Sequence, residues 1–239
     1  MIRVQKADGM LEVFDEFKVR SSLKRAGVDD ISVNNILTNL KDRLYDGIPS
    51  DKIYRSIYQL FSKQSKTNYR YNLKRAIMDL GPTGYPFEHF VAGVLSHYGY
   101  EVEVGKQVFG GCVSHEIDVI AVKDGIKNMV ECKFHNQPGA KSGIRTVLYT
   151  YARFLDTRDK NQFQSSWLAT NTKVTSEAIQ YANCVGMRIL SWNYPSDFCL
   201  RLLVERANLH PITARDDLSS SRKSELLRQG IVFLKDLKD

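Results

Sequence analysis

The chain has 239 residues and is 43% hydrophobic, which is enough to bury one large core or two smaller ones. Its 34 Lys and Arg against 27 Asp and Glu give a formal charge of +7, which favours a polyanionic partner such as nucleic acid about as much as a merely soluble surface. No apolar run suits a membrane span, the N-terminus lacks a signal-peptide pattern, and the four cysteines form no CxxC pair. We expect a cytoplasmic protein with reduced thiols, no membrane partner and neither a zinc cluster nor a disulfide framework.

The first 80 residues read as a short hairpin followed by helices. Apolar residues flank Asp8-Gly9, a dipeptide typical of a tight turn between two strands. Pro49-Ser50-Asp51 indicates the start of a new helix. Apolar residues recur at roughly helical spacing on either side of that start: Phe17, Leu23, Ile31, Ile36, Leu40, Leu44, Ile53, Ile57, Leu60 and Phe61. We expect residues 1–80 to form a small α+β module.

A cluster of helix breakers from Gly81 to Pro86 predicts a domain boundary. The pattern after it predicts, in order, a helix at 87–98, strands at 100–109, 115–122 and 126–134, a helix at 144–155, a strand at 165–170, a helix at 176–184 and a strand at 187–192. This αβββαβαβ order predicts an α/β domain with a mixed sheet over residues 81–195. Residues 196–239 read as a C-terminal helical extension.

The two strands at 115–122 and 126–134 carry charges where a buried strand would favour valine. If Asp124-Gly125 forms a two-residue turn, Asp118 faces Glu131 and Glu116 faces Lys133 on one side of the sheet. Two like charges directly opposed across strands destabilise a sheet. Something must offset that repulsion.

A divalent cation between Asp118 and Glu131 would offset it, and Mg²⁺ is the natural candidate because it prefers oxygen ligands. The backbone carbonyl of Cys132 is a candidate third ligand, which leaves positions for a phosphate and a nucleophilic water. Lys133 would orient that water or neutralise charge on phosphorus. The alternative is a solvent-facing hairpin in which Glu116 and Lys133 form an ordinary ion pair.

The acidic strand with Asp118 and the following Glu131-Cys132-Lys133 resemble the PD-(D/E)xK nuclease superfamily, and most closely its Mrr-like restriction endonuclease branch. The match covers roughly residues 84–194, with Ile117 in place of the proline of the superfamily name. The resemblance implies a restriction-endonuclease-like fold and a Mg²⁺- or Mn²⁺-dependent endodeoxyribonuclease. It also implies that Asp118, Glu131 and Glu88 bind the metal ion.

Glu88 matches an acidic position on the first helix of these nucleases, although a helix-dipole role explains it equally well. His115 is a candidate phosphate contact or a strand-end histidine satisfied by the backbone. Lys141, Arg145 and Lys173 are candidate contacts to the DNA backbone. On family grounds we also expect a homodimer, because one site cuts one strand.

The first 80 residues resemble the ATP-cone, a regulatory nucleotide-binding module. The match comprises its opening, with Val4, Lys6, Asp8, Gly9, Glu12, Phe14 and Lys18, and its closing helix at Asn68–Ile77. The resemblance implies ATP or dATP as an effector, bound by Val4, Lys6 and Lys18. Ala7 and Met10 stand where the family usually has basic residues, so nucleotide binding stays open.

The sequence therefore predicts a nuclease domain between an N-terminal nucleotide sensor and a C-terminal helical extension. The extension, residues 196–239, is interpreted as a cap on the nuclease domain or as a helical DNA contact. The alternative function is a DNA-binding protein that does not cleave and whose oligomerisation ATP controls. DNA specificity, methylation dependence and a role in restriction or repair are not indicated by any residue.

Overall fold

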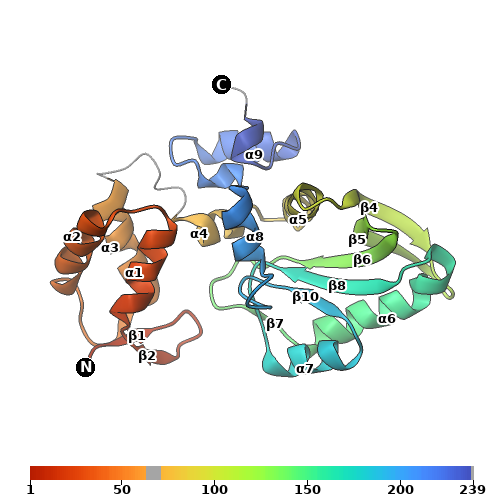
Figure 1. Cartoon of the computed structure of the whole chain (residues 1–239), viewed down its shortest axis with the longest axis horizontal. Coiled ribbons are helices and arrows are strands. Elements are labelled where there is room, and N and C mark those ends of the chain that lie inside the picture. Colours follow the sequence, from red (N-terminus) through yellow and green to blue (C-terminus); the bar gives the residue numbers. More distant parts are fainter. Residues whose placement is uncertain (63–70, 238–239) are drawn as a thin grey trace. The chain divides into compact units, whose positions relative to one another are not determined.

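The structure, a computed structural model, describes residues 1–62 and 71–237 (Figure 1). It divides into two compact units, Met1–Leu73 and Lys74–Asp239. The boundary predicted at residues 80 and 81 lies inside the second unit, because helix α4 (Leu73–Met78) is held there. The hydroxyl of Thr213 donates a hydrogen bond of 2.5 Å to the carbonyl oxygen of Ala76. Asn68 to Arg70, the start of the predicted closing helix, lie outside the described residues.

The first unit has the predicted hairpin and helices. Its sheet has the order β2-β1-β3, with β1 antiparallel to β2 and parallel to β3. The prediction missed β3, which has only two residues. The elements are β1 (Arg3–Gln5), β2 (Leu11–Val13), α1 (Glu16–Arg25), α2 (Asp30–Lys41), β3 (Ile48–Pro49) and α3 (Ser50–Ser62).

Local side-chain chemistry fixes these elements. Gly9 takes a φ of +82° at the hairpin turn, which a residue with a Cβ adopts only with strain. Asp15 and Asp29 cap α1 and α2 by accepting backbone N–H groups. Phe17 and Ile31 were predicted as core residues, and this is wrong, because they are 74% and 75% exposed. The core is formed instead by residues such as Leu23, Val33, Ile36, Leu40, Ile48 and Ile57.

The second unit contains a five-stranded mixed sheet with the order β10-β8-β6-β5-β4. The strands β4, β5 and β6 are antiparallel neighbours, and β6, β8 and β10 run parallel. The predicted αβββαβαβ order is confirmed, with two short strands, β7 and β9, added. The elements are α5 (Tyr85–His97), β4 (Glu101–Phe109), β5 (Ser114–Lys123), β6 (Ile126–Lys133), β7 (Lys141–Ser142), α6 (Ile144–Asn161), β8 (Ser165–Thr170), β9 (Lys173–Val174), α7 (Ser176–Cys184) and β10 (Arg188–Leu190).

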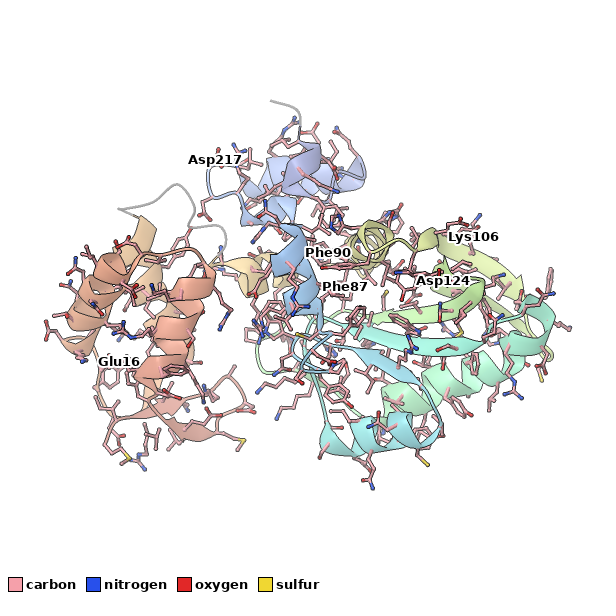
Figure 2. The ribbon with its side chains drawn as sticks, in the orientation of Figure 1. Glu16, Phe87, Phe90, Lys106, Asp124 and Asp217 are labelled. Atoms are coloured by element: carbon pink, nitrogen blue, oxygen red, sulfur yellow. The ribbon has the colours of Figure 1, made fainter. Side chains whose placement is uncertain are left out.

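The β5–β6 hairpin has the predicted turn, with φ of +51° at Asp124 and +75° at Gly125. The residue Asp124 is labelled in Figure 2. The predicted register holds for the pairs from Lys123–Ile126 to Val119–Val130, where the ladder ends. The next pair of the register, Asp118 with Glu131, is not part of the ladder. The predicted opposition of Asp118 with Glu131 and of Glu116 with Lys133 as directly paired residues is therefore not observed, because the ladder ends before it reaches either pair.

Helices cover both faces of this sheet, with α5 above it and α6 and α7 below it in the view of Figure 1. Phe87 and Phe90 of α5, both fully buried and labelled in Figure 2, anchor that helix. The buried face of α6 consists of Val147, Thr150, Phe154 and Thr157. Leu148 and Leu155 have the helical spacing of a buried stripe but are 44% and 43% exposed.

The C-terminal extension packs on α5 as part of the second unit. Its elements are α8 (Leu200–Ala207), η2 (Ile212–Ala214), α9 (Ser220–Arg228) and η3 (Leu234–Asp236). The Phe233 ring lies 5.2 Å from the Phe90 ring, and a Cβ on Gly93 would approach Phe233 to 2.3 Å. Gly93 therefore allows the close approach of Phe233. None of the helices in the described parts of the chain is both long and apolar enough to cross a bilayer.

Candidate active site

The predicted acids meet where β5 and β6 stop pairing. On the far side of β6, pairing with β8 continues to Lys133–Thr170, so β6 stays in the sheet and the gap opens toward β5. The carboxylate of Asp118 lies in that gap and accepts a hydrogen bond of 2.7 Å from the backbone N–H of Cys132. The end of the strand pairing thus creates the space that the charged side chains require.

A glycine accompanies this opening on the other neighbour of β5. In the β4–β5 register, Gly105 is opposite Asp118, between the pairs Val104–Val119 and Lys106–Ile117. Gly105 has a φ of +63°, a conformation that distorts a strand and that glycine adopts readily. Both ladders of β5 are therefore interrupted at the level of Asp118.

Burial and mutual repulsion make the acids of this site hard to ionise. Burial, followed by the charges of Asp118 and Glu116, raises the pKa of Glu88 to about 7. Burial and the charge of Asp118 raise the pKa of Glu131 to about 7. Burial also raises the pKa of Asp118, and the hydrogen bond from the Cys132 backbone opposes that shift. A divalent cation relieves this kind of repulsion.

Glu88 comes from the first turn of α5, where Pro86 is also placed. Asp118 and Glu116 on β5 raise the pKa of Glu88, so the carboxylates of the helix and the strand repel one another. The structure thus brings Glu88, Asp118 and Glu131 into one electrostatic group. Lys133 is exposed at the end of β6 and forms no ion pair with another described residue.

His115, a predicted phosphate contact, instead contacts an acidic side chain of α6. Its Nε2 lies 2.7 Å from the Asp156 carboxylate, which also accepts the backbone N–H groups of Cys112 and Val113. These contacts, led by the one to His115, hold the pKa of Asp156 well below its usual range. His115 therefore fastens the start of β5 to α6.

Arg153 of α6 is a site residue that the sequence analysis did not identify. Its Nη1 lies 2.5 Å from Oε2 of Glu131 and donates a hydrogen bond of 3.1 Å to the carbonyl oxygen of Glu116. The Arg153 and Glu131 side chains are 13% and 14% exposed, so solvent screens this ion pair weakly. Arg153 thus places a positive charge among the acids.

The donor set suits a hard divalent cation such as Mg²⁺ or Mn²⁺. Asp118 and Glu131 offer carboxylate oxygens, which these ions prefer. In residues 1–62 and 71–237, no group of three or more His, Cys, Asp and Glu side chains is arranged to hold a metal ion. Because Mg²⁺ is often bound by one or two carboxylates together with waters and substrate phosphate, two acids are a sufficient contribution from the protein.

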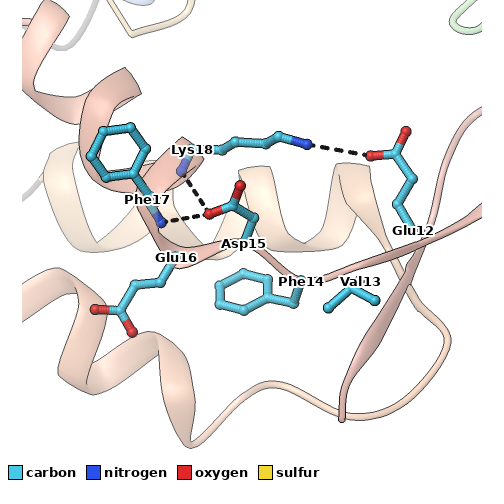
Figure 3. Close-up of a pocket in the computed structure, with 7 residues that line it drawn as sticks. All are labelled: Glu12, Val13, Phe14, Asp15, Glu16, Phe17 and Lys18. Atoms are coloured by element: carbon cyan, nitrogen blue, oxygen red, sulfur yellow. Dashed lines mark hydrogen bonds and ion pairs between the residues drawn. The ribbon is translucent and has the colours of Figure 1, made fainter.

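In the first unit, the predicted nucleotide contacts lie together. Val4, Lys6 and Lys18 all line one hollow of about 120 Å³. Both lysines pair with Glu12, at 3.2 Å for Lys6 and 3.7 Å for Lys18. A larger hollow of about 630 Å³ adjoins it along residues 12–18 (Figure 3). Figure 3 also shows Asp15 accepting the backbone N–H groups at the start of α1.

Comparison with known proteins finds similarity within the second unit. Residues 82–193 match the Mrr_cat family model, which is described as a restriction endonuclease. An uncharacterized protein of Archaeoglobus fulgidus is 42% identical over 147 residues, which are 62% of this chain and 83% of that protein. The chain belongs to the same family as this archaeal protein.

Solved structures similar to parts of the chain include the following two. The crystal structure of AF1548, a protein of unknown function, shares 42% identity and a TM-score of 0.59, and the match covers 64% of this chain and 82% of that one. A repair endonuclease from Pyrococcus abyssi is 18% identical, with a TM-score of 0.33 over 42% of this chain and 41% of that one.

Proposed function

We propose that the chain is a metal-dependent endonuclease that hydrolyses phosphodiester bonds in DNA. The observation that carries the proposal is the pair of acids, Asp118 and Glu131, in the gap where β5 and β6 stop pairing within a restriction endonuclease domain. Charge adds support, since a chain with a formal charge of +7 is attracted to a polyanion. The ion used would be Mg²⁺ or Mn²⁺.

A bound divalent ion would lower the pKa of a coordinated water and stabilise charge on the reacting phosphate. In this proposal Asp118 and Glu131 bind the ion, with the backbone carbonyl of Cys132 as a third ligand and Glu88 as a supporting acid. Lys133, exposed and not paired with a described residue, orients the attacking water or neutralises charge on phosphorus.

Basic residues near the end of the sheet are the proposed contacts to the DNA backbone. Lys141 of β7 and Lys173 of β9 are direct partners in a short parallel ladder. Arg145 follows in the first turn of α6. Both lysines are exposed, and their positive charges suit contacts to the phosphates of a DNA backbone. Cleavage of both strands would require two protomers, and a homodimer is therefore part of the proposal.

A nucleotide site in the first unit is the second part of the proposal. Its support is that Val4, Lys6 and Lys18 line one hollow, as a nucleotide site requires of residues that share a ligand. ATP or dATP would have to displace Glu12 from both lysines. Titration calorimetry with ATP and with dATP tests this directly, and Lys6→Ala should abolish any heat of binding. If the wild-type chain gives no heat with either nucleotide, the nucleotide proposal is wrong.

Cleavage is tested with supercoiled plasmid DNA in Mg²⁺ or Mn²⁺. The wild-type protein should nick it, whereas Asp118→Ala and Lys133→Ala should lower the rate by about 10²-fold or more, because each removes a group acting on the reacting phosphate. Glu101→Ala, an exposed acid on β4, is the matched control and should nick normally. Equal activity of the wild type and Asp118→Ala would refute the assignment.

Binding without cleavage is the alternative function, and the same experiment separates it. A wild-type protein that retards DNA in a gel but never nicks it would be a binding protein, and ATP-dependent sedimentation would then test controlled oligomerisation. Single-stranded, branched, methylated and RNA substrates tested in parallel would identify the preferred nucleic acid.

A further inference from the structure

The ion pair between Arg153 and Glu131 uses only half of the Glu131 carboxylate. Arg153 Nη1 contacts Oε2, and no described residue donates a hydrogen bond to Oε1. Asp118 shows the same division, because its Oδ2 accepts the Cys132 N–H and Oδ1 has no donor in the described part of the chain. Each of the two carboxylates thus has one oxygen hydrogen-bonded within the protein and one oxygen without a donor among the described residues.

Arg153 is itself fixed from the opposite side by Tyr149, one helical turn earlier on α6. The guanidinium carbon lies 4.7 Å from the centre of the Tyr149 ring, and Nη2 donates a hydrogen bond to the Tyr149 hydroxyl. The planar guanidinium satisfies three acceptors at once: the Glu131 carboxylate, the Glu116 carbonyl and the Tyr149 hydroxyl. A lysine ammonium lacks the fork and the flat face that allow this.

We propose that Arg153 is a positioning residue for Glu131. It fixes the orientation of the Glu131 carboxylate through its contact with Oε2, so that Oε1 remains directed to a divalent cation shared with Asp118. Tyr149 holds Arg153 in place. This inference rests on the proposed function, since it assigns Arg153 to the same metal site.

A guanidinium near a metal ion also repels it, so Arg153 could instead weaken metal binding. The Arg153 guanidinium pairs with Glu131 and also interacts with the charge of Asp118, so its charge compensates acids more than it opposes an incoming cation. Partners that orient a metal-binding side chain typically contribute about 10- to 100-fold in metal affinity or activity. The positioning role therefore predicts that loss of Arg153 weakens metal binding, whereas simple repulsion predicts that it strengthens binding.

Titration calorimetry with Mn²⁺ alone, without DNA, distinguishes the two. Arg153→Gln and Arg153→Lys should each weaken Mn²⁺ binding by about 10-fold or more. Arg158→Gln is the matched control, because Arg158 is on the same helix, is 46% exposed and pairs with Asp159 at 3.5 Å, away from the acids. Its Mn²⁺ affinity should equal that of the wild type. Unchanged or tighter binding by Arg153→Gln would overturn the proposal.

Arg153→Lys separates geometry from charge, since it keeps the charge and loses the fork. Wild-type Mn²⁺ affinity in that variant would also overturn the proposal. If Arg153→Gln does not fold, Tyr149→Phe supplies the test, because it removes only the hydroxyl that holds Arg153. It should broaden the electron paramagnetic resonance spectrum of bound Mn²⁺ and weaken binding by a few-fold, and an unchanged spectrum and affinity would contradict the role of Tyr149.

The proposed function can fail separately. A wild-type protein that binds no Mn²⁺, or an Asp118→Asn variant that binds it as tightly as the wild type, would refute the metal site itself and the Arg153 proposal with it. Wild-type binding that depends on Asp118 but not on Arg153 would refute the Arg153 proposal alone.

Discussion

The two ends of the β5–β6 hairpin are built from similar residues and behave differently. At the turn end the strands pair regularly up to Lys123–Ile126, and the Lys123 ammonium donates a hydrogen bond of 2.7 Å to the carbonyl oxygen of Tyr98. At the other end the pairing stops, Lys133 is exposed, and acids repel one another. Lys123 thus stabilises the fold, whereas Lys133 is the lysine to which we assign a role in the proposed reaction.

The comparison shows how one hairpin combines a regular ladder with a group of partly buried acids. A regular ladder satisfies its backbone groups by itself, so the turn end needs no ligand. Where the ladder ends, Asp118 replaces a strand partner by accepting the Cys132 N–H. The open end thus gives up sheet stability in exchange for free carboxylate oxygens, as functional sites often do.

The largest effect on stability is expected at the last regular pair. Val130 is fully buried, so Val130→Ala should leave a cavity and lower the free energy of unfolding by about 2 kcal/mol. Ile126→Ala on the same strand, where the side chain is 49% exposed, is the control and should cost much less. Urea denaturation measures both, and equal losses would show that the burial of Val130 does not set the cost of its truncation.

A smaller loss is expected at the turn. Gly125→Ala places a Cβ at a φ of +75°, which should cost about 1 kcal/mol. Asp124→Gly is the control, since Asp124 already has a φ of +51° and glycine adopts that value without strain. Both variants should nick DNA at the wild-type rate below their melting temperatures. A loss of nicking in a folded Gly125→Ala protein would mean that the two ends are not independent.

The smallest effect is a gain in stability at the open end. Burial and the charge of Asp118 raise the pKa of Glu88 to about 7. At a pH between the ordinary pKa of a glutamate and 7, the folded protein therefore keeps a proton on Glu88 that the unfolded chain has released. Stability therefore falls as the pH rises through that window. Without metal, Glu88→Gln should raise the melting temperature at pH 8.5 by about 1–3 °C and change it less at pH 5.5.

Melting curves in EDTA test this prediction, with Glu101→Gln on β4 as an exposed control. If the control raises the melting temperature at pH 8.5 equally, or if Glu88→Gln lowers it, the folded protein does not raise the pKa of Glu88 as proposed.

Much of this fold was predictable because its signals are local. The turn at Asp124-Gly125 fixed the register, and α7 was predicted with its observed bounds, Ser176–Cys184. The signals that failed depend on tertiary context. Leu148 and Leu155 have the spacing of a buried stripe but lie on the outer side of α6, while Thr150 and Thr157 are buried. The strands β7 and β9 are too short to give a periodic pattern.

Only those residues of the candidate site that depend on local sequence signals were predictable. The grouping of Asp118, Glu131 and Lys133 follows from strand alternation around one turn. Arg153 lies on helix α6, and its contact with Glu131 of β6 depends on how that helix packs on the sheet. Thr150 and Thr157 share the helical face of Arg153 and are buried, and these polar residues on the buried face of α6 were the available signal. The ATP-cone resemblance stays a prediction, supported by the shared hollow of Val4, Lys6 and Lys18.

The position of a metal ion tests the central claim most directly. Crystals soaked in Mn²⁺ should show one anomalous-scattering peak at the open end of the hairpin, about 2.1 Å from one oxygen of Asp118 and one oxygen of Glu131. Glu131 should keep its contact with Arg153 through its other oxygen. A peak on other residues, or no peak at a concentration that supports DNA nicking, would contradict the account.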